Sequence, residues 1–226
     1  ELLRFGGAVM KNVAGFDVSR LLCGSLGVLG LIAEVTLKVL PRPRLEQTLV
    51  LELGAAQALA LFNRNRGQPL PVSAQAWHGG RAAVRLSGAA SAVAAARARL
   101  GGELLDDTAA ETLWRELRDH AHPLLAPASA PLWRLSVPPT VPLESAGAAL
   151  VDWGGALRWL RSDEPAQALR ERIAALGGSA MRWHGNRAAA PMFQPLDPVN
   201  LELHRRLKQR FDPQGIFNPG RLVAGL

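Results

Sequence analysis

Residues 11–30 read KNVAGFDVSRLLCGSLGVLG, and within this stretch Gly24, Gly27 and Gly30 recur every three residues. Because glycine has no Cβ, the backbone at these positions can approach a ligand closely, and successive N–H groups can face an anion such as a pyrophosphate. An ordinary turn before a strand is the alternative, since glycine is common in such turns. The pattern differs from the Gly-x-Gly-x-x-Gly dinucleotide fingerprint, because a strand rather than a helix is expected after it.

That strand is predicted at residues 31–39. Apolar and polar residues alternate from Leu31 to Val39, which is the two-residue period of a half-buried strand. Pro41 and Pro43 end it, so a domain boundary is expected near residue 44. Residues 1–5, ELLRF, also have the pattern of a strand, and the chain begins with Glu rather than Met. We therefore expect the first half of this domain to lie upstream of residue 1.

The composition predicts a globular protein. The chain has 226 residues, of which 48% are hydrophobic, enough for one or two domains at about 100–200 residues each. It contains no run of roughly 20 uncharged apolar residues, so we expect no membrane-spanning helix. Cys23 is the single cysteine, which excludes an internal disulfide and a cysteine-built zinc or iron–sulfur site and fits a reducing cytoplasm. We expect Cys23 to be a small buried apolar residue.

The net charge of +7 does not by itself indicate nucleic-acid binding. The arginines are scattered among acidic residues instead of forming a stripe with interleaved aromatics. One local cluster, Arg205, Arg206, Lys208 and Arg210, falls in the last turns of a predicted helix, where cations complement the helix dipole. We interpret this cluster as a solvated helix end, with an anionic partner or cofactor as the alternative.

After residue 44 the sequence alternates strand and helix patterns that are typical of an α+β fold. The predicted strands are 46–53, 72–79, 81–87, 131–137, 149–160 and 179–184. The predicted helices are 55–65, 89–100, 108–120 and 163–176. We expect an antiparallel sheet with helices on one face. We also expect the six tryptophans, among them Trp153 and Trp159, to fill its core.

The C-terminal tail is predicted to be a helix followed by two turns. Asp197 and Pro198 are a cap and first-turn pair. One face of the helix is made by apolar residues four apart, Val199, Leu203, Leu207 and Phe211. The ending FDPQGIFNPGRL combines proline and glycine twice, as two successive turns favour. These turns would hold Arg221 in a defined place.

Residues 6–43, GGAVMKNVAGFDVSRLLCGSLGVLGLIAEVTLKVLPRP, together with DPQGIFNPGRL at 212–222, resemble the FAD domain of vanillyl-alcohol-oxidase (PCMH) type flavoproteins. More closely, the chain resembles the family of FAD-binding E subunits of bacterial glycolate oxidase, also called glycolate dehydrogenase. The segments PLWRLSVP and LVDWGGALRWLRS are also similar to that family. The resemblance implies the second part of a PCMH-type FAD-binding domain at 1–43, a substrate-side cap domain at 44–192, and a tail at 193–226 that returns to the FAD domain.

The resemblance also implies where FAD would bind. Residues 24–30 would line its diphosphate and ribose, and the backbone at Leu31 and Ile32 would face the adenine. Arg221 would bring a cation to the flavin, with a surface salt bridge as the alternative. Phe16 stands where a tyrosine is usual. The implied contacts are Asn12, Gly15, Asp17, Gly24, Ser25, Leu26, Gly27, Val28, Leu29, Gly30, Ile32, Asn218 and Arg221.

The sequence names no catalytic residue. Catalytic relatives carry a Gly-His-x-Gly-Asp-Gly-Asn-x-His motif, whereas this chain has MRWHGNRAAAPMF at 181–193. We therefore expect His184 to be an ordinary strand-end histidine. We expect His120 and His122 to be surface residues rather than metal ligands, and we predict no metal site.

The activity that the resemblance implies is oxidation of a small 2-hydroxy acid, glycolate, to the 2-oxo acid glyoxylate, with FAD as cofactor. The implied partners are an FAD-containing D-type subunit and an iron–sulfur subunit that receives the electrons. A self-sufficient FAD-linked D-2-hydroxy-acid dehydrogenase and a non-catalytic assembly subunit are the alternatives. The expected location is the cytoplasm, with association to the inner membrane through partner subunits as an option. Without the first half of the FAD domain, the chain is expected to be inactive alone.

Overall fold

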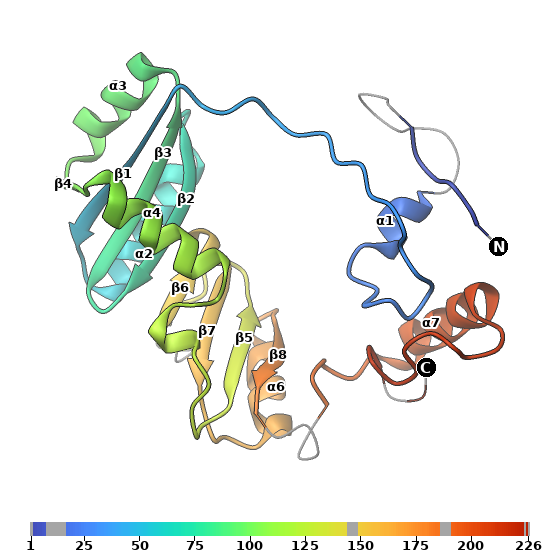
Figure 1. Ribbon diagram of the computed structural model, residues 1–226. Coiled ribbons are helices and arrows are strands. Elements are labelled where there is room, and N and C mark those ends of the chain that lie inside the picture. Colours follow the sequence, from blue (N-terminus) through green and yellow to red (C-terminus); the bar gives the residue numbers. More distant parts are fainter. Residues whose placement is uncertain (1, 8–16, 144–148, 186–190, 224, 226) are drawn as a thin grey trace. The chain divides into compact units, whose positions relative to one another are not determined.

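The computed structural model describes residues 2–7, 17–143, 149–185, 191–223 and 225 (Figure 1). The chain divides into two compact units. One, which we call the turn unit, comprises Glu1–Val39 and Pro195–Leu226. The other, the sheet unit, comprises Leu40–Gln194. No helix in the described part of the chain is long and apolar enough to cross a membrane.

The sheet unit is built on an antiparallel sheet, which confirms the predicted α+β class. Among the described residues the sheet has eight strands, in the order β4-β1-β3-β2-β6-β7-β5-β8. The strands are β1 (Leu45–Glu52), β2 (Val72–His78), β3 (Arg81–Gly88), β4 (Glu103–Leu104), β5 (Leu132–Ser136), β6 (Leu150–Asp152), β7 (Leu157–Arg161) and β8 (Ser179–His184). Neighbouring strands run antiparallel throughout.

The two halves of the sheet repeat one arrangement. Outward from the centre, β2, β3, β1 and β4 are matched in order by β6, β7, β5 and β8. The halves meet at a short ladder, in which Trp77 pairs with Val151 and His78 pairs with Leu150. Each half therefore has the same internal strand order, and the chain crosses between them once, from β4 to β5.

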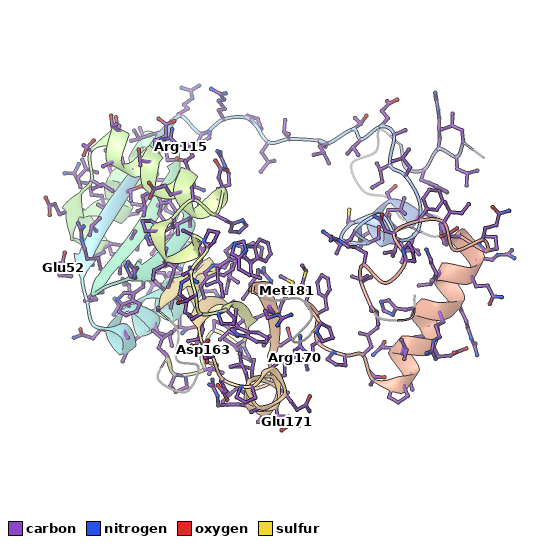
Figure 2. All side chains as sticks on the ribbon, turned by 60° about the horizontal axis from the view of Figure 1, so that its bottom comes forward. Glu52, Arg115, Asp163, Arg170, Glu171 and Met181 are labelled. Carbon is purple, nitrogen blue, oxygen red and sulfur yellow. The ribbon has the colours of Figure 1, made fainter. Side chains whose placement is uncertain are left out.

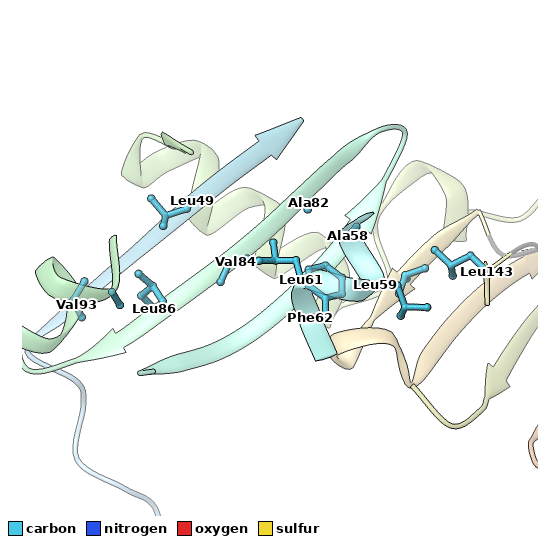
Figure 3. Close-up of a cluster of buried hydrophobic side chains, with 12 residues drawn as sticks. Leu49, Ala58, Leu59, Leu61, Phe62, Ala82, Val84, Leu86, Val93 and Leu143 are labelled. Carbon is cyan, nitrogen blue, oxygen red and sulfur yellow. The ribbon is translucent and has the colours of Figure 1, made fainter. Parts of the chain in front are cut away.

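Most helices pack on one face of the sheet. Phe62 of α2 (Ala55–Arg66) and Val93 of α3 (Ala90–Leu100) belong to a buried cluster that includes Leu49 and Val84 of the strands (Figure 3). In the second half of the sheet, α6 (Ala166–Ala175) supplies Leu169 and Ile173 to a cluster with Trp133 and Leu135. Burial of these apolar side chains is the main stabilising contribution of this face.

The opposite face carries α4 (Asp107–Arg118), so the expectation of helices on one face alone is wrong. Leu117 of α4 joins a buried cluster with Leu132 and Trp159 of the sheet. Trp114 donates its indole N–H to Thr48 Oγ1 at 2.8 Å. These strands are apolar on both faces at their centre, so a second helical layer is needed to cover them.

The predicted strand at 149–160 is two strands separated by a tight turn. A 3₁₀ turn, labelled η2 (Trp153–Gly155), interrupts it between β6 and β7. Trp153, Gly154 and Gly155 all have positive φ angles, which a continuous strand does not allow. This turn leaves Trp153 69% exposed, so the expectation that it fills the core is wrong, whereas Trp159 is buried.

The turn unit contains α1 (Val18–Leu22) and α7 (Pro198–Phe211). The predicted cap of α7 is confirmed, because Asp197 Oδ1 accepts from the backbone N–H groups of Val199 and Asn200. The apolar face of α7 is only partly covered, since Val199 and Leu203 remain exposed. Cys23 follows α1 and is exposed, so the prediction of a buried cysteine is wrong.

The predicted strand at 31–39 is absent. Residues 31–40 have no strand structure and are all exposed, Leu31 at 84% and Val39 at 79%. A strand needs a hydrogen-bonded neighbour, and none of the described strands lies in the turn unit. For the same reason residues 2–5 form no strand. The prediction of a half-buried strand is therefore wrong, because alternation in the sequence does not supply a pairing partner.

Candidate functional site

The glycines at 24–30 form two successive turns after α1. Asp17 caps that helix, since its Oδ1 accepts from the Arg20 N–H at 3.0 Å. The first turn is closed from Ser25 N to Leu22 O at 3.2 Å, and the second from Val28 N to Ser25 O at 3.1 Å. Gly24 and Gly27 have φ angles of +77° and +74°, a region that glycine enters without the cost other residues bear. We call residues 22–30 the glycine turn.

The glycine turn offers backbone donors that the protein does not use. Within the described part of the chain, five of its N–H groups have no acceptor, those of Gly24, Leu26, Gly27, Leu29 and Gly30. A Cβ added at Gly24 or Gly30 would meet no atom within 4 Å. Unpaired N–H groups beside open space are the arrangement in which backbone binds phosphate groups.

The end of the chain forms a second pair of turns, residues 212–221, which we call the C-terminal turn. Asp212 accepts from the N–H groups of Ile216 at 3.1 Å and Phe217 at 2.8 Å. Arg221 N closes the next turn on Asn218 O at 3.1 Å. Asn218 then reaches the glycine turn, because its Nδ2 donates to Leu26 O at 2.7 Å. The two glycine-containing segments, far apart in sequence, are therefore hydrogen-bonded to each other.

Lys208 joins the same contact from inside α7. Its Nζ donates to Val28 O at 2.8 Å, to Asp212 Oδ2 at 2.5 Å and to Phe217 O at 2.6 Å. The residue is buried, so the expectation that it belongs to a solvated helix end is wrong. Burial opposes ionisation of Asp212, but the hydrogen bonds from Lys208, Phe217 and Ile216 outweigh it and hold the pKa of Asp212 below its usual value.

The structure brings together most of the residues that were expected to contact FAD. Ser25, Val28 and Leu29 are buried beneath the turn. Ile32 lies beyond it in the exposed extended segment. Arg221 is exposed, and its side chain has no hydrogen bond or ion pair with a described residue. Asn12 and Gly15 lie outside the described residues.

Sequence reasoning missed Lys208 as a functional candidate. The available signal was its spacing four residues before Asp212 in the KQRFDP stretch, which is the spacing of an ion pair on one helical turn.

The sheet unit has a site of its own, a cleft of about 1060 Å³ on the face that α4 partly covers. Arg134 lies on its floor, between Trp159 and Met181 in the strand register. Met181 on β8 and Arg115 on α4, which also line the cleft, are labelled in Figure 2. Sequence reasoning gave no hint of this cleft, because its residues come from strands far apart in the chain.

Aromatic rings make the wall of this cleft. His120, Trp159 and Trp183 pack against one another, with ring centroids 4.8–5.4 Å apart. His120 is exposed, as expected of a surface residue, and its ring also packs on the cleft wall. His184 ends β8, as predicted. Among the described residues, no group of three His, Cys, Asp or Glu side chains could hold a metal ion.

The cleft is lined by charged side chains of both signs, Glu46, Asp107, Glu111 and Asp152 together with Arg85, Arg115, Arg118 and Arg134. Arg85 forms an ion pair with Glu46 and donates a hydrogen bond to Ser73 Oγ. Its guanidinium also lies 5.3 Å from the centroid of the Trp114 ring. Arg134 is half-buried, and its side chain makes no hydrogen bond or ion pair within the described part of the chain. Burial raises the pKa of Asp152, against the opposing effects of the Trp153 N–H and nearby cations. An incoming carboxylate could give Arg134 the acceptor it lacks.

Residues 150–222 match the family of FAD linked oxidases, C-terminal domain. They run from β6 through the C-terminal turn. This segment is similar to the C-terminal domain of FAD linked oxidases.

Comparison with known proteins extends this similarity toward the N-terminus. Glycolate oxidase subunit GlcE of Escherichia coli (strain K12) is 42% identical over 99% of the chain, which confirms the resemblance expected from the sequence. Glycolate oxidase subunit GlcD of Bacillus subtilis is 42% identical over 50 residues, 22% of the chain and 11% of that relative. D-lactate dehydrogenase of Anaerostipes hadrus is 43% identical over 44 residues, 20% of the chain and 9% of that relative. The chain spans 62% of the length of GlcE.

FAD is the cofactor that the FAD linked oxidase family implies, and the glycine turn fits part of it. Two glycines with positive φ, open space where a Cβ would project, and unpaired N–H groups form a cradle for a diphosphate. Without a ligand, the exposed N–H groups of the turn bind water, which a diphosphate would displace.

Proposed function

We propose that this protein is the FAD-binding subunit of a glycolate-oxidising complex. The observation that carries the proposal is the glycine turn with unpaired N–H groups, hydrogen-bonded to the C-terminal turn, in a chain 42% identical to GlcE over 99% of its length. The reaction would be oxidation of a small 2-hydroxy acid, glycolate, to the 2-oxo acid. The turn unit would be part of the FAD domain and residues 44–192 the cap.

When bound, FAD would accept the hydride equivalent released by such an oxidation. The residues of this chain would hold it. Residues 24–30 would bind the diphosphate through backbone N–H groups, and the backbone at Ile32 would serve the adenine side. Arg221, whose guanidinium is exposed and without a described partner, would supply a positive charge for the flavin side. Asn12, Gly15 and Asp17 complete the proposed contacts.

The cleft of the sheet unit would take the substrate. Its half-buried Arg134 would bind the carboxylate of glycolate through charge-assisted hydrogen bonds, which are the stronger kind. The Trp159 and Trp183 rings would give the bound acid an apolar wall on one side. Asp152 and His120, which line the cleft, are the proton acceptors that we propose for the reaction.

The proposed partners are an FAD-containing D-type subunit and an iron–sulfur subunit that receives the electrons. GlcE and GlcD are both named as subunits of glycolate oxidase, which supports an assembly of more than one chain. The proposed location is the cytoplasm, with contact to the inner membrane only through those partners. The short match to D-lactate dehydrogenase favours, as a second candidate, a self-sufficient FAD-linked 2-hydroxy-acid dehydrogenase.

The test is to purify the full-length protein alone and with its co-expressed partner subunits, and to record flavin absorbance and glycolate-dependent dye reduction. We expect flavin in the full-length protein and glycolate oxidation only in the complex. Oxidation by the isolated protein would support the second candidate instead. A full-length protein that stays colourless after incubation with FAD would contradict the cofactor assignment and leave an assembly role.

A further inference from the structure

We propose that Lys208 and Asn218 are positioning residues that aim two backbone donors of the glycine turn at the cofactor diphosphate. The inference rests on the proposed FAD site and assigns a role to side chains that do not themselves contact the ligand. Each side chain donates a hydrogen bond to a carbonyl oxygen of the glycine turn, and the N–H group that it orients lies on the other side of the same peptide plane.

Two carbonyl groups of the glycine turn accept hydrogen bonds from side chains near the end of the chain. Asn218 donates to Leu26 O at 2.7 Å, and Lys208 donates to Val28 O at 2.8 Å. Both carbonyls belong to the glycine turn, and both partners come from the end of the chain. Two alternate peptide planes of the turn are thus hydrogen-bonded to the tail.

The second step follows from peptide geometry. In a trans peptide, the C=O of one residue and the N–H of the next point in opposite directions across a rigid plane. The described peptide bonds here are trans. Because Leu26 O and Val28 O point at the tail, the N–H groups of Gly27 and Leu29 point away from it. These are two of the N–H groups that have no acceptor in the described part of the chain.

The side chain of Lys208 suits this position because its Nζ contacts three acceptors. An ammonium group has three N–H donors. Those of Lys208 donate to Val28 in the glycine turn, to Asp212 at the end of α7 and to Phe217 in the C-terminal turn. The charge is neutralised locally by Asp212, which is itself buried. A buried pair of this kind holds geometry more reliably than it adds net stability. Lys208 therefore fixes the peptide plane that presents the Leu29 N–H.

The test uses the full-length protein with three variants. Lys208→Met keeps the apolar stem and removes the donors, and Asn218→Ala removes the other carbonyl partner. The matched control is Arg206→Met, which breaks the ion pair of Arg206 with Glu202 on the same helix at the same four-residue spacing, but on the exposed surface. The readouts are the dissociation constants of FAD and of ADP, which carries the diphosphate without the flavin, at a temperature where each variant is folded by circular dichroism.

We expect Lys208→Met to weaken both FAD and ADP by about 10- to 100-fold and Asn218→Ala by roughly tenfold, since each removes the restraint on one donor. Arg206→Met should bind both ligands like the wild type. A folded Lys208→Met protein with wild-type affinity for FAD would overturn the inference while leaving the FAD site intact. If Lys208→Met does not fold, Asn218→Ala decides, and unchanged FAD and ADP affinities would overturn the inference. Absence of FAD binding in the wild type would instead remove the proposed function on which it rests.

Discussion

The alanine substitution at Gly27 gives a quantitative test of how the glycine turn is held. A Cβ at this position would lie 2.9 Å from Asn218 Nδ2, closer than ordinary contacts, at a residue whose φ is +74°. Holding an L-residue in this region costs roughly 1–2 kcal/mol. Displacing Asn218 would also break its hydrogen bond to Leu26 O, worth about 0.5–1.5 kcal/mol. We expect Gly27→Ala to destabilise the turn by about 1.5–3.5 kcal/mol.

Substitutions at Gly24 and Gly30 allow the backbone cost and the cost of the contact with Asn218 to be measured separately. Gly24 has a φ of +77° and no atom within 4 Å of an added Cβ, so Gly24→Ala should show the backbone cost alone. Gly30 has neither a positive φ nor a close neighbour, so Gly30→Ala should leave stability unchanged. If the cofactor approaches the turn there, Gly30→Ala should nevertheless weaken FAD binding.

The assay is urea unfolding of the full-length protein without FAD, followed by FAD titration of each variant. The expected order of stability is wild type and Gly30→Ala together, then Gly24→Ala, then Gly27→Ala. Equal stability of the Gly27→Ala and Gly24→Ala proteins would show that the contact with Asn218 contributes nothing. Unchanged FAD affinity in all three variants would place the cofactor elsewhere.

Three further predictions concern the sheet unit. Phe62→Ala should lower the free energy of unfolding by about 3–5 kcal/mol, measured by urea denaturation, because Phe62 is fully buried; a loss below about 1 kcal/mol would argue against the packing of α2. Arg134→Gln should raise KM for glycolate by about tenfold or more in the complex without changing flavin content, whereas Arg99→Gln on the exposed side of α3 should not. An unchanged KM would exclude Arg134 from substrate binding. Burial raises the pKa of Asp152 in the folded protein. At a pH above this folded-state pKa, the ionised carboxylate lowers the free energy of unfolding, whereas below the unfolded-state pKa of about 4 the group is protonated in both states and has no such effect. Asp152→Asn should therefore be more stable than the wild type at pH 7, with the difference vanishing toward pH 4, and a less stable variant at pH 7 would contradict this sign.

Local patterns were sufficient wherever neighbours in sequence decide the structure. The strands β2 and β3 were predicted at 72–79 and 81–87, and the start of α7 was predicted from Asp197-Pro198. Both depend on turn and cap chemistry within a few residues. The contact of Asn218 with the glycine turn could only be expected from the family resemblance.

The predictions failed where the structure around a residue depends on segments that are distant in the sequence. The alternation at 31–39 reports an extended backbone but not whether a neighbouring strand exists, and here the segment is exposed. Lys208 was read from its charged neighbours as solvated, although Val28 and Phe217, from other segments, enclose it. Arg134 and Trp183 share a cleft only because β5 and β8 are neighbours in the sheet. Such juxtapositions carry no periodic signal along one segment.

The mirrored strand order bears on how this fold can change during evolution. α4 lies in the single crossing between the two halves, from β4 to β5, and belongs to neither repeated strand set. It nevertheless forms one wall of the cleft. Mutations in the crossing can therefore resize the cleft while the ladders and the helices on the opposite face keep their contacts. Substitutions on α4 can thus reshape the proposed substrate site and give this fold a route to new substrates, as long as they keep the packing of its buried Leu117 against Leu132 and Trp159.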